Sequence, residues 1–248
     1  MATIAIGDVH GNLSALVDLL ATLQPLLCAK DELVFLGDYI DKGPNTRGCI
    51  DRIMAFRNEA ACRVITLLGN HEYEMLRTWK DWRSHSWIWI GGFETIESYS
   101  LSAAEQISAE FAAAGPRIVT EKAPVNYGVF FDVLPAPHVE FFTNLQLYHE
   151  TPEVICTHAG IDPRQERLQD IDPQVWVWGT ERFPTLYQGE RNVVYGHWDN
   201  SVDDVNGRPL PLRLGNRTFG IDTISKGILT AMRFPGEKIF QSRRSPVD

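Results

Sequence analysis

The sequence predicts one α/β domain that carries a mainly helical insertion. Three observations favour this fold class: short apolar runs that end at polar residues, amphipathic helical patterns between the first of these runs, and a chain of 248 residues of which 44% are hydrophobic. A chain of this length and composition buries a substantial core, so disorder is excluded as a global description. The sequence shows neither an internal repeat nor a separating linker, and we expect residues 1–248 to form a single domain.

Five apolar runs are typical of fully buried strands. Each has four or five residues that are β-branched or apolar, and a polar residue or a glycine comes next. The runs are Thr3–Ile6, Leu33–Leu36, Val64–Leu68, Val154–Thr157 and Val193–Gly196. Open α/β sheets bind their ligands at the carboxyl ends of the strands, so the residues directly after these runs are the first candidates for a functional site.

Helices are predicted between the first three strands and in a long insertion. Apolar residues recur at the spacing of one helix face at Leu13, Leu16, Val17 and Leu20, and again at Ile50, Ile53 and Met54. The intervals between these strands have about the length of one βαβ unit each. The stretch from about 73 to 150 differs, because it holds four tryptophans and an alanine-rich run at 103–114. We expect it to be a mainly helical insertion that flanks the site.

The composition excludes several partners. With 23 basic and 32 acidic residues the formal net charge is −9, which argues against a broad nucleic-acid footprint. No segment approaches the apolar length of a membrane span, and residues 1–6 show neither a basic region nor a long apolar segment. The four cysteines form no CxxC pair, which fits a reducing compartment. We therefore expect a cytoplasmic protein without a membrane or nucleic-acid partner; the oligomeric state is left open.

Six residues with metal-binding side chains stand at or just past the predicted strand ends: Asp8, His10, Asp38, Asn70, His158 and His197. Carboxylate, imidazole and amide groups together suit divalent ions such as manganese, iron or zinc, and the set holds too much nitrogen for a calcium site. Taken singly, each residue is explained as well by a helix cap or a satisfied histidine. Five strand ends that all finish in ligand-type residues instead predict a metal centre, in which Asp38 could bridge two ions.

Five motifs in the chain carry a family resemblance. They are Gly7–Gly11 (GDVHG), Gly37–Gly43 (GDYIDKG), Gly69–Glu72 (GNHE), Thr157–Gly160 (THAG) and Tyr195–His197 (YGH). Their sequences and their order resemble the phosphoprotein phosphatase branch of the calcineurin-like metallophosphoesterases, and in particular its bacterial and phage-lambda-type serine/threonine phosphatases. The resemblance implies a four-layer α/β/β/α sandwich with a two-metal site at the edge of its two sheets.

The resemblance also implies a role for each candidate ligand. Asp8, His10 and Asp38 would hold the first metal. Asp38, Asn70, His158 and His197 would hold the second, with Asp38 as the bridge. We expect two divalent ions, manganese first, with iron and zinc as alternatives. Two ions about 3.5–4 Å apart lower the pKa of a shared water and neutralise phosphate oxygens, so that metal-bound hydroxide attacks the phosphorus directly.

Two further residues are predicted to act on the leaving group. His71 follows the ligand Asn70 but belongs to neither metal set, and it is the candidate general acid. Asp41 would accept a hydrogen bond from His71, which fixes the orientation of the imidazole and favours its protonated form. An enzyme of this kind would hydrolyse phosphate monoesters without a phospho-enzyme intermediate.

The chain departs from the family pattern where phosphate should bind. Lys42 stands where the protein phosphatases usually have an arginine, and a lysine supplies a point charge in place of a planar fork. A second family arginine is replaced by Thr180; either Arg182 substitutes for it, or Arg182 is a surface residue. Trp198 directly follows the ligand His197 where a threonine is common. Core packing is the default for the tryptophans, and Trp198 is the exception to examine.

Three functions follow from these observations. A serine/threonine protein phosphatase leads, because the tetraphosphate hydrolases with this motif set typically lack the acid at Asp41. The alternative is a dinucleoside tetraphosphate hydrolase or another small-molecule nucleotide phosphatase, which the loss of the arginine pair favours. The remote alternative is a non-catalytic metal-binding homologue. The substrate would be a phosphorylated protein or a small phosphate ester, because two bound cations reverse the negative local field of the site.

Overall fold

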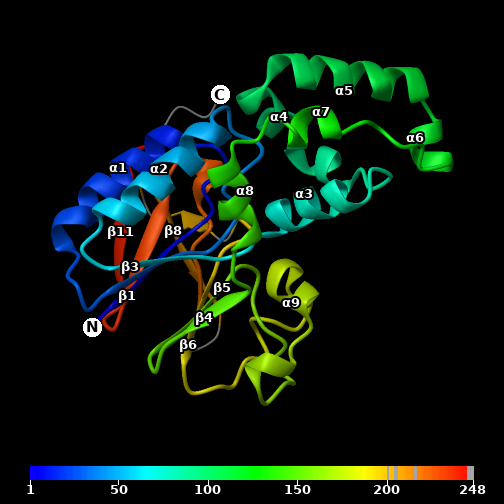
Figure 1. Ribbon diagram of the computed structural model, residues 1–248. Coiled ribbons are helices and arrows are strands. Elements are labelled where there is room, and N and C mark those ends of the chain that lie inside the picture. Colours follow the sequence, from blue (N-terminus) through cyan, green and yellow to red (C-terminus); the bar gives the residue numbers. More distant parts are fainter. Residues whose placement is uncertain (200, 204–205, 215–216, 245–248) are drawn as a thin grey trace.

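The computed structural model describes residues 1–199, 201–203, 206–214 and 217–244, and two β-sheets form its centre (Figure 1). The first sheet has the order β11-β10-β1-β2-β3, with β1 at Thr3–Ile6, β2 at Glu32–Phe35, β3 at Arg63–Thr66, β10 at Thr230–Phe234 and β11 at Lys238–Gln241. The second sheet has the order β4-β5-β6-β9-β8-β7, with β4 at Tyr148–Glu150, β5 at Val154–Thr157, β6 at Asn192–Tyr195, β7 at Ser201–Asp203, β8 at Pro209–Arg213 and β9 at Thr218–Gly220. All five predicted strands are present, within one or two residues of their predicted bounds.

The strands that lead into the candidate site are parallel within each sheet. β1, β2 and β3 pair in parallel in the first sheet, and β5, β6 and β9 do so in the second. Buried apolar residues from both sheets form one core between them: Ala5, Val34, Leu36, Ile65, Leu67, Val154, Cys156, Val194, Phe219, Ile221, Met232 and Phe234. The carboxyl ends of both sets of parallel strands therefore reach a common edge.

Two helices cover the outer face of the first sheet (Figure 1). α1 runs over Leu13–Leu23 and α2 over Thr46–Glu59, and their apolar faces pack on the sheet in one core. The side chain of Asn12 caps α1 by accepting a hydrogen bond from Ala15 N, and Asn45 caps α2 in the same way from Gly48 N. Both helices therefore begin where the chain leaves a candidate ligand loop.

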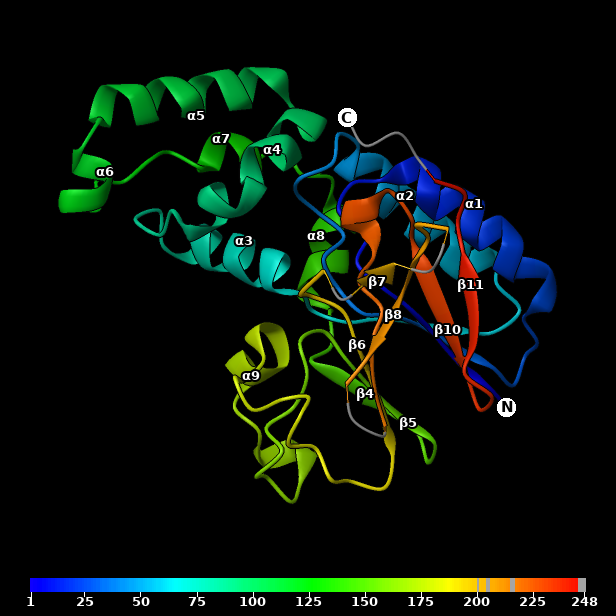
Figure 2. The same ribbon diagram turned by 180° about the vertical axis from the view of Figure 1, so that it is seen from behind.

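A helical lobe lies to one side of the sheets, as Figure 2 shows from behind. It comprises α3 (Asn70–Lys80), α4 (Phe93–Tyr99), α5 (Leu101–Ala114), α6 (Arg117–Thr120), α7 (Gly128–Phe131) and α8 (Ala136–Thr143), with a π-helical turn at Ile88–Gly92. Aromatic contacts hold the lobe together; Trp79 stacks on Phe131 at 4.7 Å between ring centroids. The range 73–150, which we predicted to be an insertion, begins within α3 and ends with β4.

The outer side of the second sheet carries a smaller covering layer. α9 (Pro173–Trp178) packs Trp176 against Ile155, Val193 and Tyr195 of the sheet. The order of layers is thus helices, sheet, sheet and helix, and the predicted α/β sandwich is confirmed. Within the described ranges, no helix has the length and apolar character that crossing a membrane requires.

Candidate metal centre

The edge shared by the two sheets gathers the predicted ligands. Two groups of side chains have ligand atoms within 4.8 Å of one another: His10, Asp38 and His71 form one, and Asp38, His158 and His197 form the other. Asp38 belongs to both groups, as a bridging carboxylate must. Each of these residues follows the end of a parallel strand, except His71, which lies in the first turn of α3. The topology therefore brings together residues that are up to 187 positions apart, from His10 to His197.

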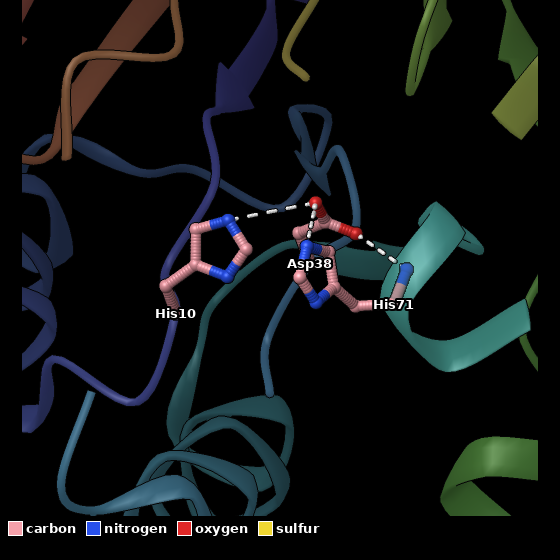
Figure 3. Close-up of side chains that lie close together, drawn as sticks. All are labelled: His10, Asp38 and His71. Carbon is pink, nitrogen blue, oxygen red and sulfur yellow. Dashed lines mark hydrogen bonds and ion pairs between the residues drawn. The ribbon is translucent and has the colours of Figure 1, made fainter. Parts of the chain in front are cut away.

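In the first group two imidazoles face one carboxylate (Figure 3). His10 Nε2 lies 3.5 Å and His71 Nε2 lies 3.8 Å from Asp38 Oδ2. His10 Nδ1 lies 2.9 Å from the carbonyl oxygen of Ile40, which only accepts hydrogen bonds, so Nδ1 is the donor. In the neutral ring Nε2 then carries the lone pair, and it accepts a hydrogen bond from Lys42 Nζ at 3.0 Å.

In the second group the acceptor nitrogen of His158 faces the side-chain oxygen of Asn70, which is also an acceptor. His158 Nδ1 donates to the carbonyl oxygen of Leu36 at 3.0 Å, so Nε2 of the neutral ring is an acceptor. That Nε2 lies 2.9 Å from Asn70 Oδ1, and His197 Nδ1 lies 2.9 Å from the same oxygen. Burial lowers the pKa of His158, which makes the neutral ring the relevant form. Acceptor atoms that converge in this way suit a cation.

Asp8 supplies the clearest unsatisfied group. Its Oδ2 accepts a hydrogen bond from His197 N at 2.9 Å, while its buried Oδ1 has no partner among the described residues. Burial, with the neighbouring charges of Asp222 and Asp38, raises the pKa of Asp8. A buried carboxylate in this environment is neutralised by a proton or by a bound cation. Asp8 nevertheless lies outside both groups above, and His71 stands in the first group where the resemblance implies Asp8.

Two histidines of the site, His10 and His197, are in the form that binds metals. Burial lowers the pKa of His10 to about 3 and that of His197 to about 3. Both imidazoles are thus neutral at pH 7, which is the state that ligation requires. His197 Nε2 is buried and has no partner among the described residues. The donor set of carboxylates, neutral imidazoles and an amide oxygen fits divalent ions.

The predicted acid and its partner are in direct contact. His71 Nδ1 lies 2.7 Å from Asp41 Oδ2, and both side chains are buried. Burial alone would lower the pKa of His71, but the Asp38 carboxylate and the hydrogen bond to Asp41 outweigh it and raise the pKa. Asp41 also accepts hydrogen bonds from Trp87 Nε1 at 3.0 Å and from Thr95 Oγ1 at 2.6 Å. The helical lobe therefore holds the carboxylate that orients His71.

Glu72 fixes the two loops that carry the central ligands. Its carboxylate accepts from four backbone N–H groups: Asp38 N at 3.0 Å, Tyr39 N at 2.8 Å, Ile40 N at 3.2 Å and Gly69 N at 3.2 Å. The side chain is fully buried. Gly69 is required here, because a Cβ at this position would overlap the Asp38 carboxylate. One side chain from α3 thus sets the position of the loop after β2.

Several site residues have a left-handed backbone, which side chains other than glycine rarely adopt. They are His10 (φ 43°), Asp38 (φ 51°), Asp41 (φ 69°), Lys42 (φ 63°) and His197 (φ 76°). Such conformations cost roughly 1 kcal/mol or more each and persist only where the surrounding structure enforces them. They concentrate at the loops that follow β1, β2 and β6.

The two predicted phosphate-binding residues lie in different places. Lys42 is exposed and its ammonium group contacts His10, at the rim of the first group. Arg182 is also exposed, in the loop after α9, where its charge lowers the pKa of Asp162 as a minor contribution beside the larger one of Arg164. Among the described residues Arg182 contacts no member of either ligand group. Its proposed role in place of the missing arginine stays a prediction.

A groove opens from the ligand groups to the surface. It has a volume of about 1000 Å³, begins at His10, Lys42 and His197, and runs along α1. Trp198 lines it with 60% of its surface exposed, and its ring centroid lies 4.1 Å from that of His197. The groove is large enough for a ligand of several rings and phosphates.

Four residues of the site received no role from the sequence: Glu72, Trp87, Thr95 and Asp222. Glu72 follows His71 directly, and its place in the motif was a usable signal. Asp222 follows β9 at the same edge and accepts a hydrogen bond from Asp199 N at 2.8 Å, so the rule of strand ends could have found it. Trp87 and Thr95 gave no signal, because their contact with Asp41 depends on how the lobe folds back.

Two sheets with carboxylates and neutral imidazoles at their shared edge, beside a buried Asp–His pair, define a metal-dependent hydrolase. The family model for calcineurin-like phosphoesterases matches residues 1–222, and the chain belongs to that family. It is accordingly a hydrolase that acts on phosphate esters. The narrower assignment to the serine/threonine phosphatases rests on the motifs alone.

The curated relatives include dinucleoside tetraphosphatases. An asymmetrical bis(5'-nucleosyl)-tetraphosphatase from Oceanobacillus iheyensis is 28% identical over 262 residues, which cover 96% of this chain and 90% of the relative. A symmetrical bis(5'-nucleosyl)-tetraphosphatase from Pseudomonas fluorescens is 32% identical over 83 residues. That match covers 33% of this chain and only 26% of the relative, about a quarter of its length.

Solved structures share the fold. One provisionally described as a diadenosine tetraphosphatase has a TM-score of 0.61 at 18% identity and covers 97% of this chain and 92% of its own. A protein serine/threonine phosphatase from Saccharomyces cerevisiae has a TM-score of 0.52 at 13% identity and covers 100% of this chain and 81% of its own. At these identities the likeness concerns the fold, and both classes of substrate are found on it.

Proposed function

We propose that the chain hydrolyses dinucleoside polyphosphates at a two-metal centre, with His71 as the general acid. The observation that carries the hydrolysis is the contact of 2.7 Å between His71 Nδ1 and Asp41, directly beside the shared carboxylate Asp38. Because Asp41 holds Nδ1, the other ring nitrogen faces the ligand groups and is the atom that would give its proton to the leaving oxygen. We expect manganese first, with iron and zinc as alternatives.

The residues divide the work as follows. Bound divalent ions supply positive charge for the phosphate oxygens and lower the pKa of water. Asp8, His10, Asp38, Asn70, His158 and His197 would hold them. Asp41 keeps the imidazole of His71 in one orientation and favours its protonated form, since the carboxylate accepts from Nδ1. Lys42 adds a positive charge at the rim, where a further phosphate of the substrate would lie.

The substrate class is supported by likeness along the whole chain. The relative from Oceanobacillus iheyensis, an asymmetrical bis(5'-nucleosyl)-tetraphosphatase, matches 96% of this chain. Lys42 supports the same substrate class, because the protein phosphatases usually have an arginine at this position of the motif. A second candidate is a serine/threonine protein phosphatase. The specific observation that favours it is Asp41 itself, which tetraphosphate hydrolases with this motif set typically lack.

Substitution of the acid tests the chemistry. His71→Asn should lower turnover by roughly 10²- to 10⁴-fold, the usual contribution of a general acid, and leave the metal content unchanged. Metal analysis and chromatographic measurement of the nucleotides released from diadenosine tetraphosphate, on the same preparation, measure both. His149→Asn is the matched control, because His149 is also paired with a carboxylate, Glu32 at 2.9 Å, but lies on β4. An unchanged rate in His71→Asn would refute the mechanism.

A substrate panel tests the class. The manganese-loaded protein should hydrolyse diadenosine tetraphosphate with a kcat/KM well above that for a phosphoserine peptide. The reverse order would assign the chain to the protein phosphatases and leave the role of His71 intact. The two experiments therefore fail independently of each other.

A further inference from the structure

The groove beside the metal centre has two chemically different ends. Its inner end is formed by His10, His197 and Lys42, where phosphates would meet cationic groups. Further along α1 the groove is lined by the apolar side chains of Leu13, Val17 and Ala21, with Ile224 and several polar residues, while the indole of Trp198 lies beside His197. An extended substrate that is anionic at one end and apolar at the other matches this division.

Trp198 is placed to present a flat apolar surface to such a substrate. Its ring meets that of His197 edge to face, with 4.1 Å between centroids and an angle of 72° between planes. Trp178 approaches the same imidazole from α9 at 5.7 Å. These contacts fix the indole beside the ligand, and yet 60% of Trp198 is exposed. Because Trp198 lines the groove, its exposed face can stack against a flat group that is bound there.

Charged side chains of both signs also line the groove. Asp18 accepts hydrogen bonds from Arg243, from its Nε at 2.7 Å and from its backbone N at 2.7 Å. Asp199 also lines the groove and is exposed. Because Arg243 neutralises Asp18, this part of the groove has no strong net charge, and a neutral group with hydrogen-bonding atoms fits it.

We infer that this groove is the nucleoside subsite of the enzyme, in which the indole of Trp198 stacks on a nucleobase of the substrate. The inference rests on the proposed function, since it assigns a part of the dinucleoside polyphosphate to a part of the site. Stacking on an aromatic ring tolerates any base and changes affinity by roughly five- to hundred-fold per base. Trp198 is then a residue that determines specificity.

Two substrates and three variants test the inference. The substrates are diadenosine tetraphosphate, which has bases, and glycerol 2-phosphate, which has none. Trp198→Ala should lower kcat/KM for the dinucleotide roughly ten- to hundred-fold more than for the glycerol ester, and Trp198→Phe should recover most of the difference. Trp89→Ala is the matched control; Trp89 is 61% exposed but lies in the helical lobe beside His85, and its loss should leave the ratio unchanged.

Binding provides a second readout. The dissociation constant of a methylene-bridged diadenosine tetraphosphate, measured by calorimetry, should rise in Trp198→Ala by the same factor. Val17→Trp, which fills the groove from the exposed face of α1, should produce the same selective loss without any change near His197.

The outcomes separate the two proposals. Suppose that the wild-type protein hydrolyses the dinucleotide, and that Trp198→Ala lowers kcat/KM equally for the dinucleotide and the glycerol ester. Trp198 then acts only through His197, and the nucleoside subsite is refuted. If the wild-type protein hydrolyses phosphopeptides and no dinucleotide, the proposed substrate class fails and the subsite with it. A selective loss on phosphopeptides in Trp198→Ala would make the groove a peptide site and would also overturn the inference.

Discussion

The two sides of the site differ in how firmly the fold holds them. On the side of the first sheet, Asp41 and Glu72 are fully buried, and each receives several hydrogen bonds that fix its position. On the side of the second sheet, the loop after β6 passes from the half-buried ligand His197 to Trp198, which is 60% exposed. The groove lies between this loop and the first-sheet side, since His10, Lys42 and α1 line it together with His197 and Trp198.

The difference indicates a division between chemistry and recognition. Catalytic groups must stay within a fraction of an ångström of their working geometry, and packing on a lobe and two sheets provides that. Groups that select a substrate lie on loops at the surface, where change is tolerated. Substitutions on the buried side should therefore lower turnover or stability for every substrate, whereas those at the exposed rim should change the choice of substrate.

The largest effect is expected at the shared carboxylate. Asp38→Asn should reduce the bound metal and lower turnover by about 10³-fold or more, because several kcal/mol of charge stabilisation are lost with the ions. Metal analysis and steady-state kinetics measure the two effects. Asp51→Asn is the control, since Asp51 also contacts a histidine, His138 at 2.9 Å, but on α2. Full metal and full activity in Asp38→Asn would contradict the assignment of the bridge.

Asp41 acts only through His71, and its loss should cost less. Asp41→Asn should lower turnover about 10- to 100-fold and leave the metal content unchanged, since Asp41 positions the acid without touching the ions. The loss should be greater for an alkyl phosphate than for p-nitrophenyl phosphate, because a good leaving group needs less help from an acid. Equal losses on both esters would show that Asp41 has a structural role alone.

Glu72 should matter for stability. Glu72→Gln replaces a carboxylate that accepts four backbone hydrogen bonds with an amide that has only one accepting oxygen. We expect the free energy of unfolding to fall by about 2 kcal/mol, because buried N–H groups lose their acceptor. Urea denaturation measures the change. Glu59→Gln, at an exposed pair with Arg52, should lower it by less than about 1 kcal/mol.

The smallest effect is expected at the rim. Lys42→Arg restores a planar fork and should lower KM for phosphate esters by roughly two- to ten-fold with little change in kcat. Initial-rate kinetics over a range of substrate concentrations give the two constants. Lys80→Arg, at the exposed end of α3, is the control. A fall in kcat instead would place Lys42 on the chemical side of the site.

The strands, and the gathering of the candidate ligands near their ends, were predictable because strands buried on both faces appear in the sequence as continuous apolar runs. Five apolar runs each ended near a potential ligand, and the fold brings those ends to one edge. The sequence could not show that His71, and not Asp8, would form a group with His10 and Asp38, since that depends on where the side chains point. Position along the chain does not encode side-chain direction past the last strand residue.

Contacts between the helical lobe and the loops of the site could not be predicted from the sequence. Trp87 and Thr95 are 46 and 54 positions from Asp41 in the chain, and only the folded lobe brings them to its carboxylate. The exposure of Trp198 could not be predicted either, because the sequence alone does not show whether a tryptophan is buried or exposed. The groove, which depends on that exposure, emerged only from the structure.

The left-handed backbone at position 42 favours glycine for stability, whereas phosphate binding favours the lysine that is present. Glycine would adopt φ 63° without strain, so Lys42→Gly should make the loop easier to form. The same change removes the positive charge beside His10. Lys42→Gly should therefore keep every candidate metal ligand, relieve backbone strain and weaken the binding of phosphate. If selection for stability leaves a lysine at position 42, the retained lysine indicates that binding of phosphate is still required.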